Sequence, residues 1–132
     1  KNRVAHNIEK KKFKNLVKKV DILNQMKLMC LSSIKLIQEN KLEEVGGLLD
    51  NFWKLKKKLS PNVSNNKIDY YYREAKKLGA TGGKLIGAGG GGFLLIYAKK
   101  KYQGRIIKKL SSLTPIRFNF SNKGSEIIEN EV

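Results

Sequence analysis

The sequence predicts an α+β fold in which helices pack on a mainly antiparallel sheet. Across residues 16–78, apolar residues recur at steps of three and four, as in amphipathic helices. After Gly79 the pattern changes to short apolar runs on either side of a glycine-rich stretch, which favours antiparallel strands. Helices and strands that are segregated along a chain are typical of the α+β class. The 132 residues have the size of one domain, which we place at residues 1–132.

Three helices are predicted before Gly79. The first carries an apolar stripe that we expect to be core: Leu16, Val20, Leu23, Met26, Cys30, Ile34 and Ile37. The second covers residues 42–59 and ends before Pro61, and its Gly46 and Gly47 indicate close packing against a neighbour. The third lies within residues 64–79, with Ser64 as N-cap and Gly79 as the C-terminal stop.

The second half of the chain predicts two hairpins around a helix. Residues 84–86 and 93–98 form the first hairpin, residues 102–113 the helix, and residues 116–120 with a strand around Ile127 the second hairpin. This order fits a ferredoxin-like arrangement, except that the usual strand before the first helix is missing. Together with the absence of an initiator methionine, this leads us to expect that the chain is part of a longer protein.

The stretch "KLIGAGGGGFLLIY" (residues 84–97) places five glycines in six positions, and each ordered glycine costs about 0.5–1 kcal/mol relative to alanine. It matches G-x-G-x-x-G literally, but a strand follows where a dinucleotide-binding loop opens a helix. A Walker A loop is excluded because Lys84 is followed by leucine and not by serine or threonine. Two interpretations remain: a flexible hairpin connection, or a backbone that a phosphate or sugar must approach closely.

The net charge of +17 suggests a polyanionic partner, but only four of the 28 basic residues are arginines. Because base reading and bidentate phosphate contacts favour arginine, this argues against nucleic acid and for a lysine-rich solvated surface. No run of 18 apolar residues predicts a membrane span. A single cysteine, Cys30, allows no internal disulfide, and we expect a cytoplasmic protein.

The segment "LGATGGKLIGAGGGGFLLIY" (residues 78–97) closely resembles the third signature motif of the GHMP small-molecule kinases, a family named for galactokinase, homoserine kinase, mevalonate kinase and phosphomevalonate kinase. It is most similar to the subgroup of D-glycero-D-manno-heptose 7-phosphate kinases. Other segments resemble that subgroup in the same order: "NRVAHNI", "LLDNFWKLKKKLSPNVSN", "KIDYYYREAKKLGA" and "PIRFNFSNKGSEII". The resemblance therefore covers nearly the whole chain.

This resemblance implies the ferredoxin-like C-terminal domain of a kinase that uses ATP and Mg²⁺ to phosphorylate a sugar hydroxyl, here of a heptose 7-phosphate. The family's ATP-phosphate-binding N-terminal domain has no counterpart in the chain, so we expect no catalytic residue here and no activity of the fragment alone. The resemblance places a nucleotide- and substrate-binding loop at Gly87, Ala88, Gly89, Gly90, Gly91 and Gly92. Lys84 lies in the strand that leads to this loop, where two interpretations are open: a point charge that approaches a phosphate, or a strand-end lysine in solvent.

Three further residues are candidates for the sugar side of the site: Trp53, Lys56 and Arg3. The alternatives are a core tryptophan, a solvated lysine and a surface ion pair. Asp50 stands where the subgroup tends to have histidine, which leaves the sugar open. His6, the only histidine, has no cysteine or acidic cluster nearby and is not expected to bind metal.

The other functional hypotheses are a GHMP kinase for another sugar or small alcohol, and a non-catalytic domain that binds polyanions or carbohydrate. A panel of substrates separates the first from a heptose kinase. Binding to a polyanion would weaken steeply with salt.

Overall fold

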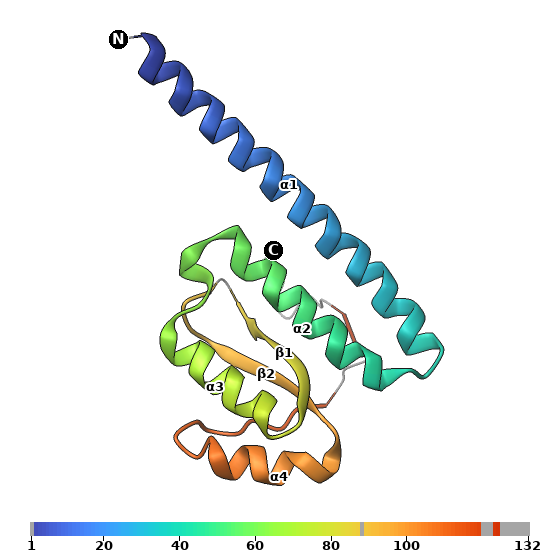
Figure 1. Cartoon of the computed structure of the whole chain (residues 1–132). Helices are drawn as coiled ribbons and strands as arrows, with labels where there is room; N and C mark the ends of the chain where they lie inside the picture. The colour runs from blue at the N-terminus through green and yellow to red at the C-terminus, as the bar shows by residue number, and fades with distance from the viewer. Residues whose placement is uncertain (1, 88, 120–122, 125–132) are drawn as a thin grey trace, which may run out of the picture.

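The structure is a computed structural model that describes residues 2–87, 89–119, 123 and 124, with side chains from residue 15 onward. Its elements are α1 (Asn2–Gln38), α2 (Leu42–Leu59), a 3₁₀ turn η1 (Pro61–Val63), α3 (Asn66–Lys77), β1 (Ala80–Ile86), β2 (Phe93–Ala98) and α4 (Lys100–Lys109). Helices pack on an antiparallel pair of strands (Figure 1), so the predicted α+β class is confirmed. None of the helices in this part of the chain is long and apolar enough to cross a membrane.

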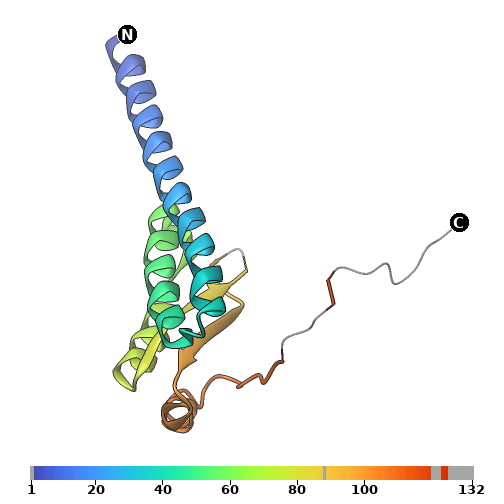
Figure 2. The same ribbon diagram turned by 90° about the vertical axis from the view of Figure 1, so that its right-hand side faces the viewer.

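Helix α1 packs on α2 with a different face from the one expected. The half-buried side chains of its described part are Ile22, Met26, Met29, Ser33 and Leu36. Most of the predicted stripe faces outward instead, with Leu16, Val20 and Leu23 between 49% and 59% exposed, and Cys30 is exposed as well. The prediction that this stripe is core was therefore wrong. The N-terminal half of α1 runs beyond the rest of the molecule (Figure 2).

Strands β1 and β2 form an antiparallel hairpin whose register runs from Ala80 opposite Ala98 to Ile86 opposite Phe93. A bulge at Thr81 shifts the register between Ala80 and Gly82. Strand β1 begins four residues earlier than expected, because its glycines allow close contact with α2. A Cβ atom on Gly46 would lie 2.0 Å from Thr81 Oγ1, whereas Gly47 has open space around it. The close packing predicted for this pair thus holds for Gly46 alone.

Two apolar clusters make up the core, one near the start of β1 and the other near its end. One joins α3, β1 and α4 through Ala75, Ala80, Ile106 and Leu110. The other joins α2, η1 and β1 through Trp53, Val63 and Leu85, with Ile68 and Tyr72 of α3 packed against it. The second cluster lies beneath the hairpin end that leads to the glycine-rich loop.

Further predicted boundaries differ from the structure, among them that of α4, which covers Lys100–Lys109 where residues 102–113 were expected. Asn65, not Ser64, caps α3, since its side chain accepts a hydrogen bond from the N–H of Ile68 at 3.0 Å. Residues 116–119 are not a strand, because a strand requires a hydrogen-bonded neighbour and the described sheet pairs only β1 with β2. Residue 120 and the strand expected around Ile127 lie outside the described residues. The predicted stop of α3 is confirmed, because Gly79 adopts φ +97° directly after the helix.

Candidate ligand-binding site at the glycine-rich loop

The glycine-rich loop, defined as residues 87–92, forms the tip of the β1–β2 hairpin. Gly87, Gly90, Gly91 and Gly92 are exposed, Gly89 is half-buried, and Ala88 lies outside the described residues. The backbone at Gly89 has φ +127°, a conformation that favours glycine. The loop therefore presents main-chain atoms at the surface with no side chains from its glycines to cover them.

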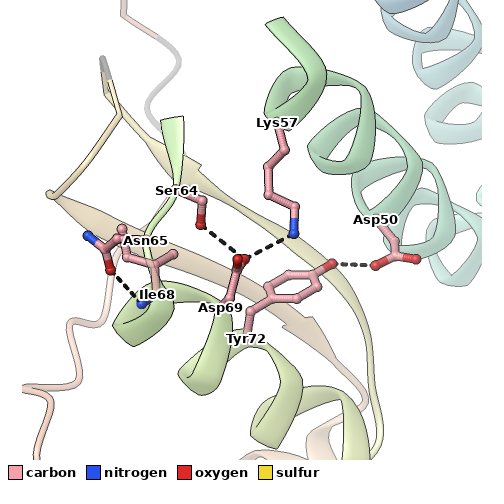
Figure 3. Close-up of polar contacts among 7 residues, drawn as sticks. All are labelled: Asp50, Lys57, Ser64, Asn65, Ile68, Asp69 and Tyr72. Carbon is pink, nitrogen blue, oxygen red and sulfur yellow. Dashed lines mark hydrogen bonds and ion pairs between the residues drawn. The ribbon is translucent and has the colours of Figure 1, made fainter. Parts of the chain in front are cut away.

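Three hydrogen bonds hold this loop against α2 and against the segment that joins α2 to α3. Lys56 Nζ of α2 donates to Gly87 O at 2.8 Å. Asn65 Nδ2 donates to Gly90 O at 3.1 Å, and Gly90 N donates to Val63 O at 3.2 Å. Because Asn65 also caps α3 through Oδ1 (Figure 3), one side chain couples the helix end to the loop.

Gly91 stands apart from its neighbours in the loop. Its φ is not positive, and a Cβ atom built on it would meet nothing within 4 Å. Neither its backbone conformation nor its packing against the described residues therefore requires glycine at residue 91. A small residue at such a surface position leaves room for another molecule to approach the main chain.

The ammonium of Lys56 gives the loop a positive charge. A lysine ammonium has three N–H donors, so its hydrogen bond with Gly87 O leaves two of them for another acceptor. An anion beside the loop would meet this ammonium and exposed main chain together. The arrangement can bind and orient an anionic group such as a phosphate.

Asp69 at the start of α3 fixes the segment that carries Asn65. Its carboxylate accepts hydrogen bonds from Lys57 Nζ and Ser64 Oγ, both at 3.0 Å (Figure 3). Burial alone would raise the pKa of Asp69, but these hydrogen bonds and the Lys57 charge outweigh it and lower the pKa. Asp69 therefore stays ionised at neutral pH and ties α2 to the segment beside the loop.

Asp50 forms a second polar junction between α2 and α3. Tyr72 Oη donates to it at 2.5 Å, and Lys54 and Lys76 form ion pairs with it at 2.8 and 3.5 Å. Burial would raise the pKa of Asp50, yet the hydrogen bonds from Lys54 and Tyr72 and the Lys76 charge lower it. Burial and the Asp50 carboxylate raise the pKa of Tyr72, which stays protonated and able to donate. Figure 3 shows the two side chains directed toward each other, so Asp50 has a structural role here.

The structure brings one of the predicted side chains to the loop. Lys56 contacts it, whereas the Lys84 ammonium lies 4.6 Å from the centre of the Phe52 ring. Trp53 is fully buried beneath the hairpin, which agrees with the alternative of a core tryptophan. Its indole N–H has no hydrogen-bond partner among the described residues. Arg3 belongs to α1, but its side chain lies outside the described part.

Sequence reasoning did not single out Asn65 or the Lys57–Asp69 pair. Asn65 lies in the run "SNN" before α3, where each residue type is a good N-cap, so the sequence signal was present but ambiguous. For the Lys57–Asp69 pair there was no such signal, because the contact between these two residues depends on how α2 and α3 pack. Among the described residues, no three His, Cys, Asp or Glu side chains gather as a metal site.

Helices on an antiparallel hairpin, whose glycine-rich tip is hydrogen-bonded to a lysine of α2, define the class of this protein as an α+β domain with an exposed glycine-rich loop. Residues 33–115 match the family model described as GHMP kinases C terminal, and the chain belongs to this family. The family resemblance of the sequence is thus confirmed.

Similar proteins include two sugar-metabolising enzymes. The chain is 35% identical over 68 residues to the bifunctional fucokinase/GDP-fucose pyrophosphorylase of Arabidopsis thaliana, covering 52% of this chain and 6% of that protein. It is 36% identical over 63 residues to the D-glycero-alpha-D-manno-heptose 7-phosphate kinase of Campylobacter jejuni, covering 48% of this chain and 19% of that protein. The chain therefore spans less than a fifth of the length of these relatives.

The fold is also similar to that of a solved kinase. The crystal structure of L. major mevalonate kinase in complex with R-mevalonate matches with a TM-score of 0.67 and 21% identity, over 84% of this chain and 34% of the other. At this identity the match shows a common fold.

Proposed function

We propose that residues 1–132 are the C-terminal domain of a longer, cytoplasmic kinase that transfers the γ-phosphoryl group of ATP to a sugar hydroxyl. A heptose 7-phosphate is the proposed substrate, because a heptose 7-phosphate kinase is among the relatives and the sequence resembles that subgroup. The partners are this sugar phosphate and the kinase's own N-terminal domain, which supplies the loop that wraps the ATP phosphates and the ligands of Mg²⁺. The 132 residues alone are inactive in this proposal.

The observation that carries the proposal is the open surroundings of Gly91. Among the described glycines of the loop, Gly91 alone has neither a positive φ nor a crowded Cβ position. Open space at an exposed main chain, next to the Lys56 ammonium, fits a phosphate or sugar that must approach closely. Phosphoryl transfer depends mainly on positioning and on stabilisation of charge, and both are roles that such a loop can serve.

The chain's own residues bind and orient in this scheme. Lys56 offers its two remaining N–H donors to a phosphate oxygen and neutralises part of its charge. Asn65 and Val63 hold the loop in place while the ligand approaches from the Gly91 side. ATP with Mg²⁺ supplies the phosphoryl group. No carboxylate of the described residues is assigned as a Mg²⁺ ligand or as a base.

The lysines around this site support the kinase over a polyanion-binding domain. Lys54, Lys56 and Lys57 make specific contacts with Asp50, Gly87 and Asp69. Much of the basic run in α2 is therefore engaged within the fold and does not form a continuous surface for a nucleic-acid backbone.

The test compares two alanine variants in the full-length kinase. Gly91→Ala and Gly104→Ala both place a methyl group in open space, one on the loop and one on α4. If a ligand approaches Gly91, the loop variant loses roughly 10- to 100-fold in kcat/KM, because a displacement of about 1 Å is costly in such a site. Gly104→Ala stays within about twofold of the parent, since it lies outside the site. Equal activity of the two variants, with unchanged thermal stability, would remove the role of the loop.

A substrate panel tests the sugar. Purified full-length protein with MgATP is assayed against a heptose 7-phosphate, L-fucose, mevalonate and homoserine, with ADP release as the readout. The proposal expects the highest kcat/KM for the heptose phosphate. A preference for another alcohol would assign another GHMP kinase activity, and no ADP release with any substrate would refute the kinase proposal.

A further inference from the structure

Helix α1 carries two apolar seams, and the described part of the chain packs against only one of them. The first seam is the half-buried set that packs on α2: Ile22, Met26, Met29, Ser33 and Leu36. The second, here called the outer seam, consists of Leu16, Val20, Leu23, Lys27, Cys30, Ile34 and Ile37. Both repeat at alternating steps of three and four, which is heptad spacing. The five aliphatic members of the outer seam are between 49% and 59% exposed.

The composition of the outer seam is that of a two-stranded coiled coil. With Val20, Lys27 and Ile34 at position a, the d positions are Leu16, Leu23, Cys30 and Ile37. Branching at Cβ at a, with leucine at d, favours paired helices, and a single polar residue at a sets their register. From Leu16 to Ile37 the seam is about 32 Å long at 1.5 Å per residue, slightly more than three heptads.

The charges beside the seam select the occupant. The flanking e positions are Val17, Asn24, Leu31 and Gln38. The flanking g positions are Lys19, Met26 and Ser33. Among these flanking residues, Lys19 alone is charged. In a chain of net charge +17, a seam for an acidic partner would have lysines at these positions. With Lys19 as the only flanking charge and Lys27 as the only charge within the seam, two identical basic helices experience little repulsion along this face. The seam is therefore compatible with itself.

We propose that the outer seam of α1 pairs with the same seam of a second copy of this chain, giving a homodimer through a two-helix coiled coil. This interface lies on α1, which contributes none of the hydrogen bonds described for the glycine-rich loop, and does not depend on the proposed kinase activity. In the dimer Cys30, an exposed thiol in the single chain, becomes covered at a d position.

Sedimentation equilibrium of the full-length protein tests the dimer with matched variants. Leu23→Gln with Ile34→Gln removes two buried aliphatic residues per copy and weakens dimerisation by at least about 100-fold. Leu28→Gln removes a leucine that is 62% exposed but lies off the seam, at position b, and leaves the dissociation constant within about threefold. All three positions are on the surface of α1, so circular dichroism should show an intact fold. Raising the salt concentration strengthens association, because it screens the like charges of the two copies.

Alkylation of Cys30 by iodoacetamide, read by peptide mass, locates the interface. The labelling rate should fall as protein concentration rises through the dissociation constant, and the double variant should restore fast labelling. A monomer at all concentrations would overturn the proposal. So would a dimer that the seam variants leave unchanged, or protection of Cys30 that persists on dilution, which would mean that another part of the same polypeptide covers the seam.

Discussion

Glycines occur in two regions of the β1–β2 hairpin, and the two regions contain them for opposite reasons. In the middle of β1, a Cβ atom on Gly82 would lie 1.8 Å from Gly46 O, and one on Gly83 would lie 2.2 Å from Leu95 O. At the tip, a Cβ atom on Gly91 would meet nothing within 4 Å. Gly82 and Gly83 are buried, and Gly91 is exposed.

The difference separates glycines that the fold requires from one that it does not. Gly82 lets the backbone of α2 rest directly on β1, so a side chain there would push two backbones apart. Gly91 has no such neighbour among the described residues, so the fold described here does not account for its small size. The crowded region, at Gly82 and Gly83, is thus where stability can be tested, and the open end, at Gly91, is where the proposed approach of a ligand can be tested.

The largest effect on stability is expected in the crowded region, at Gly82. Gly82→Ala should lower the free energy of unfolding by about 3 kcal/mol or more, because its methyl group meets main-chain atoms that cannot rotate away. Urea denaturation measures this. The matched control is Gly47→Ala on α2, where the Cβ position is open, and alanine in a helix should stabilise by about 0.5–1 kcal/mol. A loss below about 1 kcal/mol for Gly82→Ala would mean that α2 and β1 are less tightly apposed than described.

A smaller loss of stability is expected at Asp50, where side chains of α3 contact α2. Asp50→Ala removes the acceptor for Tyr72 and both ion pairs, and should cost about 1.5–3 kcal/mol, the range for hydrogen bonds to a buried charged group. Asp21→Ala is the control, since its carboxylate accepts only an exposed hydrogen bond from Gln25. Its effect should stay within about 0.5 kcal/mol. Similar losses for the two variants would contradict the structural role of Asp50.

Much of this hairpin and of the helices beside it could be predicted from the sequence. The periodicity of residues 42–59 and the change of pattern at Gly79 are local signals, and α2, α3 and the hairpin follow them. The outer face of α1 could not be assigned correctly, because two seams with the same spacing run along one helix. Which seam meets α2 depends on tertiary packing, which periodicity does not report.

The site shows the same limit. The glycine-rich loop and Lys56 were predicted through the family resemblance, and the structure places Lys56 on the loop. The role of Asn65 depends on a shift of one residue at the helix cap, and the Lys84 contact with Phe52 depends on how β1 lies on α2. These are consequences of packing between elements that are distant in sequence.

Acid should weaken both polar junctions between α2 and α3, at Asp50 and at Asp69. The pKa values of Asp50 and Asp69 are lowered in the folded state from a reference of 3.8. Their contribution to stability is therefore fully present above that value and is lost as pH falls through the folded pKa values. Urea titrations between about pH 3 and pH 7 should show stability declining below about pH 4. In Asp50→Asn the decline should be shallower. An equally steep decline would show that Asp50 does not contribute to it.

The smallest change in stability, with a local effect at the open end, is expected for Asn65→Asp. Aspartate is as good an N-cap as asparagine, so α3 keeps its cap and global stability should change by less than about 0.5 kcal/mol. The variant loses the Nδ2 donor to Gly90 O, which is one of the bonds that hold the loop. The Gly90 amide, which donates to Val63 O, should then exchange with solvent roughly 2- to 10-fold faster by NMR, the equivalent of one hydrogen bond. Asn65→Ala gives the contrast, since it loses the cap as well and should cost about 1 kcal/mol globally. If Gly90 exchanges at the parental rate in Asn65→Asp, the loop is held by Lys56 and its own backbone, and the coupling of α3 to the loop through Asn65 is refuted.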